Sequence, residues 1–171
     1  MTRHVCRPQF GNRSEHGYTL VELMIVMSII SILTSISIPQ YVNYSVRARW
    51  SDNLVRVGPL KFAIAECAQF NNNAVNATTC NDVAFLIANA FLPLGYELPG
   101  PSAAGGSAPY MAMPVTVGSA TPGEIVITGT ANTALGCVVA MTPTASTSAI
   151  TWGYANRGAP GCGRTRTGVG T

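Results

Sequence analysis

The residue with the clearest chemical consequence in this sequence is Glu22, the one formally charged side chain between residues 18 and 38. This stretch of 21 residues would form a helix roughly 31 Å long, which is enough to cross the hydrocarbon core of a bilayer. A carboxylate there costs roughly 2.5–3.5 kcal/mol on insertion scales, so an intramembrane Glu is by default a functional residue. The sequence therefore predicts a membrane-spanning helix whose carboxylate must be neutralised or find a partner.

Cysteine is the second residue type with chemical potential. Of the five cysteines, Cys6 precedes the apolar stretch, and Cys67, Cys80, Cys137 and Cys162 all follow it. Cysteines on the far side of a membrane segment suit disulfides formed in an oxidising compartment, and four of them allow three pairings. There is no CxxC spacing and no histidine among them, so we expect neither a metal nor any other cofactor.

The remaining polar residues do not form the constellations of an enzyme. Both histidines, His4 and His16, lie within the first 17 residues, which leaves the rest of the chain without the usual base of a hydrolytic triad. No phosphate-binding loop and no activated nucleophile is present, and the later carboxylates lack the paired spacing of general acid–base catalysis. Those carboxylates are Asp52, Glu66, Asp82, Glu97 and Glu124.

Charge is sparse along the whole chain of 171 residues, of which 10% are charged and 47% hydrophobic. The net charge is +3, and without residues 1–17 seven basic residues face six acidic ones. A nearly neutral chain of this kind does not indicate a nucleic-acid partner by bulk electrostatics. The arginines within residues 1–17 are typical of a cytoplasmic segment that fixes the orientation of a membrane helix. An ordinary secretory signal is the alternative, but Glu22 and the amphipathic helix that follows disfavour it.

A second helical pattern follows the apolar stretch. Six residues recur every three or four positions and predict one apolar face, with Asp52 on another face where it can pair with Arg49 or Arg56. The six are Trp50, Leu54, Val57, Leu60, Ile64 and Cys67. The continuing period predicts one helix over residues 18–70, kinked at Pro39 and Pro59. Its first half, residues 18–38, would be membrane-spanning, and its second half, residues 39–70, would be amphipathic.

Residues 71–109 predict a long connecting loop with a short helical piece. Strand patterns then follow at residues 110–117, 124–130, 135–141 and 149–154, separated by turn residues. They predict an antiparallel sheet of about four strands within residues 110–171, packed on the helix in an α+β fold. The Gly-rich tail holds Arg157, Arg164 and Arg166, which could contact DNA or another surface. Such arginines are more often simply solvated.

The start of the apolar stretch resembles the prepilin signature of type IV pilins and pseudopilins. Gly-Tyr-Thr-Leu-Val-Glu at residues 17–22 and the apolar run after it match the start of the mature family members. Ile-Pro-Gln-Tyr-Val-Asn-Tyr at residues 38–44 is similar to the midpoint of their long helix. The resemblance is strong over residues 17–50. Tyr18 replaces the usual Phe, and Ser31 stands where many members have Gly.

The resemblance implies how the first residues are processed and used. Residues 1–17 would be a leader peptide cleaved after Gly17 by a prepilin peptidase, and Tyr18 would become an N-methylated amino terminus. That amine lies four residues before Glu22, so the pair could close within one subunit or join the Glu22 of an incoming subunit to the amine of its neighbour. The family implies the second arrangement, which sets the axial register of a filament. Pro39, at the exit from the membrane, is where a bend or local melting of the helix would matter most for assembly.

The cysteine layout also resembles that family. Cys67 at the helix end and Cys80 in the loop would close a short ring, and Cys137 would pair with Cys162 as in the C-terminal disulfide loop of type IV pilins. The two other pairings, which require the helix end to reach the tail, stay open.

The resemblance implies a structural subunit of a type IV pilus rather than an enzyme. The prepilin would be held in the inner membrane as a single-pass protein with a cytoplasmic N-terminus, and would then join a helical homopolymer outside the cell. Its implied partners are the prepilin peptidase, an assembly ATPase, an inner-membrane platform and an outer-membrane secretin. Adhesion, twitching motility or DNA uptake would be the role of the filament. The alternatives are a minor or DNA-binding competence pilin and a pseudopilin of type II secretion.

Overall fold

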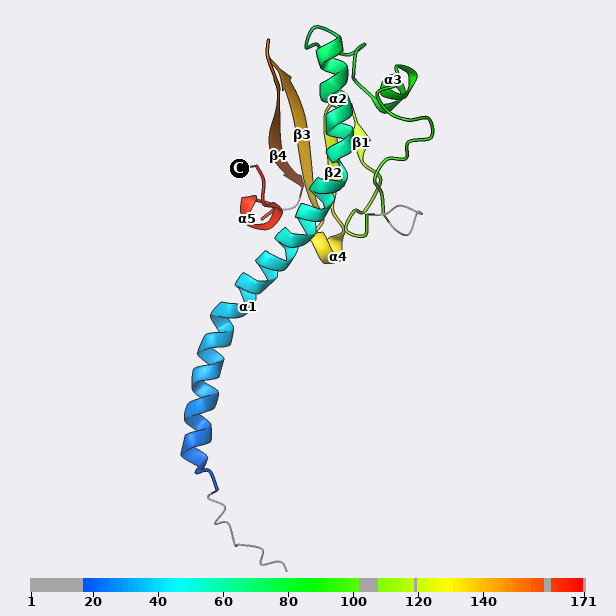
Figure 1. Ribbon diagram of the computed structural model, residues 1–171. Helices are drawn as coiled ribbons and strands as arrows, with labels where there is room; N and C mark the ends of the chain where they lie inside the picture. The colour runs from blue at the N-terminus through cyan, green and yellow to red at the C-terminus, as the bar shows by residue number, and fades with distance from the viewer. Residues whose placement is uncertain (1–16, 102–107, 119, 159–160, 171) are drawn as a thin grey trace, which may run out of the picture. The chain divides into compact units, whose positions relative to one another are not determined.

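The computed structural model describes residues 17–101, 108–118, 120–158 and 161–170. The chain divides into two compact units, Met1–Pro39 and Gln40–Thr171. The described part of the first unit is helical, and the second unit combines helices with a four-stranded sheet, so the fold is α+β (Figure 1). Residues 1–16 of the expected leader, Cys6 and both histidines among them, lie outside the described residues.

Helix α1 covers Leu20–Arg56 and is long and apolar enough in its first half to cross a membrane, with a mean hydropathy of 2.2 over its most apolar window. The helix continues through Pro39. Serine and threonine hydroxyls along it bond the carbonyls three or four residues earlier, as Ser31 does with Met27 at 2.7 Å. These side chains therefore satisfy their own polar groups within the helix, which is what an apolar surrounding requires.

The prediction of one continuous helix to residue 70 is wrong at Val57. Helix α1 ends at Arg56, and a separate helix, α2, covers Gly58–Phe70 with Pro59 in its first turn. A proline removes a backbone donor and clashes with the turn before it, so it fits the start of a helix better than the interior. The sequence period continues across the break because both helices turn the same apolar face toward the core.

The sheet is an antiparallel meander in the order β1-β2-β3-β4, as Figure 1 shows. Strand β3, Cys137–Ala145, pairs over its whole length with β4, Ile150–Gly158. Strand β2, Ile125–Thr128, pairs with the first half of β3, and β1 is only Thr116–Val117. A meander of this kind needs only tight connections, and a Ser146–Ala149 turn joins the two long strands.

The predicted first strand, residues 110–117, is mostly irregular chain, with a single bridge from Met111 to Gly129. Its backbone donors bond two different segments, since the amide of Ala112 reaches Thr128 and that of Val115 reaches Pro99. Pro114 lies between them and cannot donate to a ladder. The apolar residues of this segment therefore pack locally without forming a ladder, and only Thr116–Val117 pairs as a strand.

The core of the second unit lies between the helices and one face of the sheet. Alternate residues of β2 and β3 point into it, among them Ile127 and Val139. Helices α1 and α2, with Val57 between them, supply nine buried side chains. Asn53 is one of the nine, whereas the expected Leu54 is only partly buried. The nine are Val46, Trp50, Asn53, Val57, Leu60, Ala63, Ile64, Cys67 and Ala68.

Trp50 is the largest fully buried side chain of this core, and its indole Nε1 donates to the carbonyl of Ala134 at 3.3 Å. Ala134 closes α4, Ala131–Ala134, a short helix between β2 and β3 that the sequence pattern did not predict. Gly129 completes this contact, because a Cβ placed on it would lie 2.8 Å from the Trp50 ring and 2.7 Å from the Ala134 methyl.

Two disulfide bonds join outlying segments to the core. Cys67 at the end of α2 pairs with Cys80, and Cys137 at the start of β3 pairs with Cys162. The first bond holds the loop that leads to α3, Val83–Ala88, whose N-cap is Asp82. The second holds the tail that contains α5, Arg164–Thr167. Cross-links of this kind stabilise segments that have little core of their own.

Gly129→Ala should lower the free energy of unfolding of the second unit by about 1–3 kcal/mol, because the new methyl group overpacks the contact between Trp50 and Ala134. Gly58→Ala is the matched control, since a Cβ at Gly58 meets no atom within 4 Å. Urea denaturation of the full chain in neutral detergent, followed by near-ultraviolet circular dichroism, measures both variants. Equal stability of the two variants would contradict this account of the Trp50 contact.

Candidate functional site

The predicted processing junction lies immediately before α1. Gly17 and Tyr18 lie outside the helix, and the Tyr18 side chain is 84% exposed. Chain that is neither helical nor buried can be bound by a peptidase. The junction is thus accessible from solvent in the described part of the chain.

Glu22 and Thr19 form a reciprocal cap at the start of α1. The Glu22 Oε2 accepts hydrogen bonds from the backbone N–H and the hydroxyl of Thr19, both at 2.9 Å. In return the backbone N–H of Glu22 donates to Thr19 Oγ1 at 3.3 Å. This is the Thr-x-x-Glu capping box, in which two otherwise unpaired amide donors are satisfied at a helix start.

The sequence analysis missed this role of Thr19, although the Thr-x-x-Glu spacing before an apolar run is its recognised signature. The cap has a chemical consequence for Glu22. Both bonds end on Oε2, and no described residue donates to Oε1. A carboxylate offers about four acceptor positions, so the cap fixes the orientation of the group and leaves one oxygen for another donor.

The apolar half of α1 has no partner within the described chain. Every residue from Leu20 to Val42 is exposed. The exposed large apolar residues lie on all sides of the helix rather than on one face, which is typical of a segment surrounded by lipid or by other helices. They include Leu23, Ile25, Val26, Ile29, Ile30, Ile32, Leu33, Ile36 and Ile38.

Pro39 is the last residue of the first compact unit. Helix α1 is α-helical on both sides of it. A proline inside a helix removes one backbone hydrogen bond, so this is the weakest point of α1. Its expected role in assembly remains a prediction.

The three tail arginines predicted as a surface contact lie on two elements, β4 and α5. Arg157 lies on β4 and its Nη2 pairs with the Glu124 Oε1 at 2.7 Å. The Glu124 side chain is fully buried, and its Oε2 has no hydrogen-bond partner among the described residues. Arg157 is therefore the counter-charge of a buried carboxylate. If Arg157 bound a phosphate group instead, the buried carboxylate would lose its partner and the fold would lose stability.

Arg164 and Arg166 lie on α5. A third arginine, which the sequence pattern did not suggest, contacts this helix from α1. Arg47 on α1 donates from Nε and Nη2 to the carbonyl of Thr165, at 3.3 and 3.0 Å. Thr165 lies between the other two arginines in sequence. Only the tertiary structure reveals this neighbourhood, because Arg47 and Thr165 are 118 residues apart.

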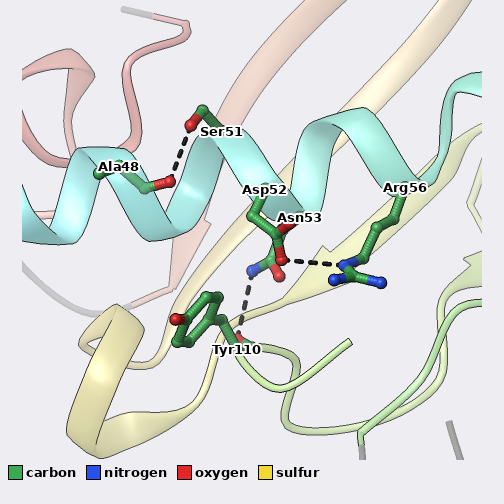
Figure 2. Close-up of polar contacts among 6 residues, drawn as sticks. All are labelled: Ala48, Ser51, Asp52, Asn53, Arg56 and Tyr110. Atoms are coloured by element: carbon green, nitrogen blue, oxygen red, sulfur yellow. Dashed lines mark hydrogen bonds and ion pairs between the residues drawn. The ribbon is translucent and has the colours of Figure 1, made fainter. Parts of the chain in front are cut away.

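A shallow groove of about 470 Å³ lies beside α1 on the second unit. Asp52 pairs with Arg56 at 2.9 Å along its rim, and Asn53 donates from Nδ2 to the Tyr110 carbonyl at 3.2 Å, as Figure 2 shows. Arg49 lies over the Tyr110 ring at 6.0 Å from its centroid. These contacts bind the polar side of α1 to the loop before β1, so they are structural. No group of three or more potential metal ligands occurs in the described part of the chain.

Arg157→Gln should lower the free energy of unfolding by about 1–3 kcal/mol, because it leaves the buried Glu124 without its one hydrogen-bonding partner. Arg56→Gln removes an exposed i,i+4 pair on the same unit and should cost about 0.3–0.5 kcal/mol. Adding Glu124→Gln to the Arg157 variant should restore part of the loss. Chemical denaturation of the three variants measures the difference, and equal losses for the two arginine variants would disprove the structural role of Arg157.

Comparison with protein families agrees with both parts of the chain. Residues 12–38 match the model of the prokaryotic N-terminal methylation motif. Residues 46–161 match the model of the pilin, a bacterial filament protein. The first match contains the Gly17–Tyr18 junction and the Thr19–Glu22 cap. The second contains the sheet and the Cys67–Cys80 disulfide, and it ends one residue before Cys162.

Curated relatives match mainly through the long helix. A probable minor fimbrial protein of Dichelobacter nodosus is 46% identical over 52 residues, which is 30% of this chain and 33% of the relative. A fimbrial protein of Pseudomonas aeruginosa is 36% identical over 73 residues, 43% of this chain and 47% of the relative. The prepilin peptidase-dependent protein D of Escherichia coli is 44% identical over 54 residues, 32% of this chain and 37% of the relative.

The chain thus spans between a third and a half of the length of these relatives. The pilin match over residues 46–161 covers more than half of the chain and coincides with the packed sheet unit described above. Together with the methylation motif at the start of α1, it assigns the sequence plainly: the chain belongs to the pilin family of bacterial filament proteins.

Proposed function

We propose that this pilin is a structural subunit of a type IV pilus. Its leader is cleaved after Gly17 by a prepilin peptidase, Tyr18 becomes the N-methylated amino terminus, and copies of the chain then polymerise into a surface filament. Family membership makes the protein structural and non-enzymatic. The proposal adds the processing site, the assembly contact and the kind of filament.

The observation that carries the proposal is the exposed apolar half of α1, with a capped carboxylate in its first turn. Burying a large apolar side chain is worth about 1.5–3 kcal/mol, so a helix with this many exposed apolar residues cannot remain in water. Lipid covers it while the prepilin is stored, and the helices of other subunits cover it in the filament. Identical subunits that associate head to tail without closing a ring form such a filament.

Glu22 supports the direction of this assembly. The capping box holds the carboxylate at the start of α1 and uses only Oε2, so Oε1 can accept from the methylated amine of Tyr18 in a neighbouring subunit. A charge-assisted hydrogen bond is roughly twice as strong as a neutral one, and it is stronger again where water is excluded. The pair would therefore fix the axial register between subunits.

The second unit forms the outer surface of the filament in this proposal. The prepilin is held in the inner membrane with its N-terminus in the cytoplasm, and after cleavage it is extracted into an extracellular filament. An assembly ATPase, an inner-membrane platform and an outer-membrane secretin are the partners that this route requires. Pro39 supports extraction, because a helix that lacks a hydrogen bond at the membrane exit can bend or melt there. The filament would serve adhesion, twitching motility or DNA uptake.

A minor pilin, which could be a DNA-binding competence pilin, is the second candidate. Its support is that one similar protein is a probable minor fimbrial protein, whereas another is the major fimbrial protein FimA of Dichelobacter nodosus. A type II secretion pseudopilin is disfavoured by the Cys137–Cys162 bond, which resembles the C-terminal loop of pilins. The abundance of the chain in purified filaments separates the major from the minor subunit.

Glu22→Gln should be cleaved normally but should fail to assemble, because glutamine keeps the acceptor of the capping box and removes the charge that pairs with the amine. Thr19→Ala is the matched variant, since it weakens the cap and keeps the charge, and it should assemble at a reduced level. Immunoblots of whole cells report cleavage, and the yield of sheared filaments reports assembly. Normal filaments from the Glu22→Gln variant would eliminate charge pairing.

Mass spectrometry of sheared filaments should find an abundant chain that begins at N-methylated Tyr18. This result is expected because the proposed junction between Gly17 and Tyr18 is non-helical and exposed. A chain that stays in the membrane with residues 1–17 attached would contradict the proposal. A processed chain found only at trace level in filaments would favour the minor subunit.

A further inference from the structure

We propose that Arg47, Arg164 and Arg166, named here the basal arginine cluster, bind the anionic headgroups of phospholipids while the subunit is held in the membrane. The inference rests on the membrane-inserted state of the proposed function. It assigns a ligand of stated chemistry to side chains that neither the core nor the assembly contact uses.

The cluster is assembled by the fold rather than by sequence proximity. The two hydrogen bonds from Arg47 to the Thr165 carbonyl place α5 against the first turns of α1 in the second unit. Arg47 and Arg164 are exposed, and Arg166 is half-buried with its guanidinium close to the Gly161 backbone. Arg47 therefore lies against the short helix that carries the other two arginines.

The tail that bears two of these arginines is held firmly. The Cys137–Cys162 disulfide joins it to β3, and Asn156 on β4 donates from Nδ2 to the Val169 carbonyl at 2.6 Å. Within the tail, Thr167 Oγ1 donates to the carbonyls of Gly163 and Val169. Because the backbone is fixed at both ends of α5, less conformational freedom is lost when its arginines bind a ligand.

The positive charge of the cluster is not compensated within the described residues. The two ion pairs found there are those of Arg56 with Asp52 and of Arg157 with Glu124. Neither includes a member of the cluster. A group of uncompensated arginines on an otherwise charge-poor chain attracts anions, and guanidinium forks suit phosphate oxygens in particular.

The position of the cluster along α1 favours lipid as the source of that phosphate. Tyr41, Tyr44 and Arg47 follow one another at intervals of three, so each lies beside the next on the helix surface. Both tyrosines are 72% exposed, and Tyr41 comes three residues after Ile38, where the apolar run ends. Exposed tyrosines directly after a membrane segment are typical of the headgroup level. Arg47 is one turn further along α1, where it holds α5 beside this side of the helix.

Nucleic acid is the competing anion, and the structure favours it less. Arg157, the third arginine predicted for a DNA contact, is committed to Glu124. Stacking on bases would need aromatic rings beside the cations, but the aromatic pair on β4 is already occupied. Lys61 lies 5.1 Å from the Trp152 ring centroid and 5.3 Å from that of Tyr154. The exposed rings near the cluster are Tyr41 and Tyr44, which lie on α1 directly after the apolar run.

The test measures headgroup binding by the full chain in a neutral detergent micelle. Native mass spectrometry follows titration with short-chain phosphatidylglycerol or with phosphatidylcholine of the same chain length. The wild type should prefer phosphatidylglycerol. Each of Arg164→Gln and Arg166→Gln should weaken that binding roughly fivefold at low salt, since one basic residue near an anionic surface contributes about that factor. The triple variant with Arg47→Gln should lose the preference, and added salt should reduce it in the wild type.

Arg56→Gln is the matched control, because it removes an arginine from the same helix but outside the cluster and should keep the preference. Circular dichroism and thiol titration establish that each variant is folded with both disulfides. Equal binding of the two lipids, or a preference unchanged in the triple variant, would overturn the inference.

Two competitors identify the source of the anion. Inorganic phosphate that displaces the lipid at equal concentration would overturn the assignment to headgroups, and a short DNA duplex that binds the cluster more tightly than the lipid would reassign it to nucleic acid. Alkaline extraction of cell membranes tests the underlying state separately. A chain that is extracted refutes the membrane-inserted prepilin, whereas a chain that resists extraction but lacks the lipid preference refutes only the basal arginine cluster.

Discussion

The contact on which the second unit depends is the packing of one helical face, from Val46 to Ala68, against the inner face of the sheet. Trp50 is fully buried within it and is fixed by its hydrogen bond to Ala134 and by the absence of a side chain at Gly129. Sheet residues such as Ile127 and Val139 can leave water only because this face covers them. The break at Val57 preserves the contact, since α1 and α2 both direct apolar side chains inward.

The same helix has to satisfy a different environment before Pro39. There the apolar side chains point in all directions, and no other part of the described chain covers them. The hydroxyl groups of this segment bond the backbone carbonyls of the same helix. A single-faced helix needs one partner surface, whereas a helix that is apolar all round needs a surrounding medium. This contrast within α1 is consistent with the proposed storage of the subunit in lipid beside a domain folded in water. In the proposed assembly, the capped Glu22 would add direction to a surface that is otherwise non-specific.

The long-range pattern could be predicted from the sequence because it depends on composition and period. The apolar run, the helical stripe and the antiparallel strands at β2, β3 and β4 follow from side-chain spacing, and the disulfide pairing in the structure is the one that the layout favoured. The errors lie where a local feature competes with the period. Pro59 lies in the first turn of a new helix. Pro114, together with backbone hydrogen bonds to two different segments, prevents a strand over most of residues 110–117. Helices α4 and α5 are too short to show a period.

By itself the sequence determined the placement of Glu22 in an apolar helix and the class of the fold, because these depend on neighbours close along the chain. The junction at Gly17 is predicted from the same local pattern. Only the tertiary structure decided which charges are free. It pairs Arg157 with the buried Glu124, which lies just before β2, and it joins Arg47 to Thr165 of the tail across 118 residues of sequence. Electrostatic partners are set by distance in space, and residue order carries no such information for side chains that meet across a sheet or at a disulfide-bound tail.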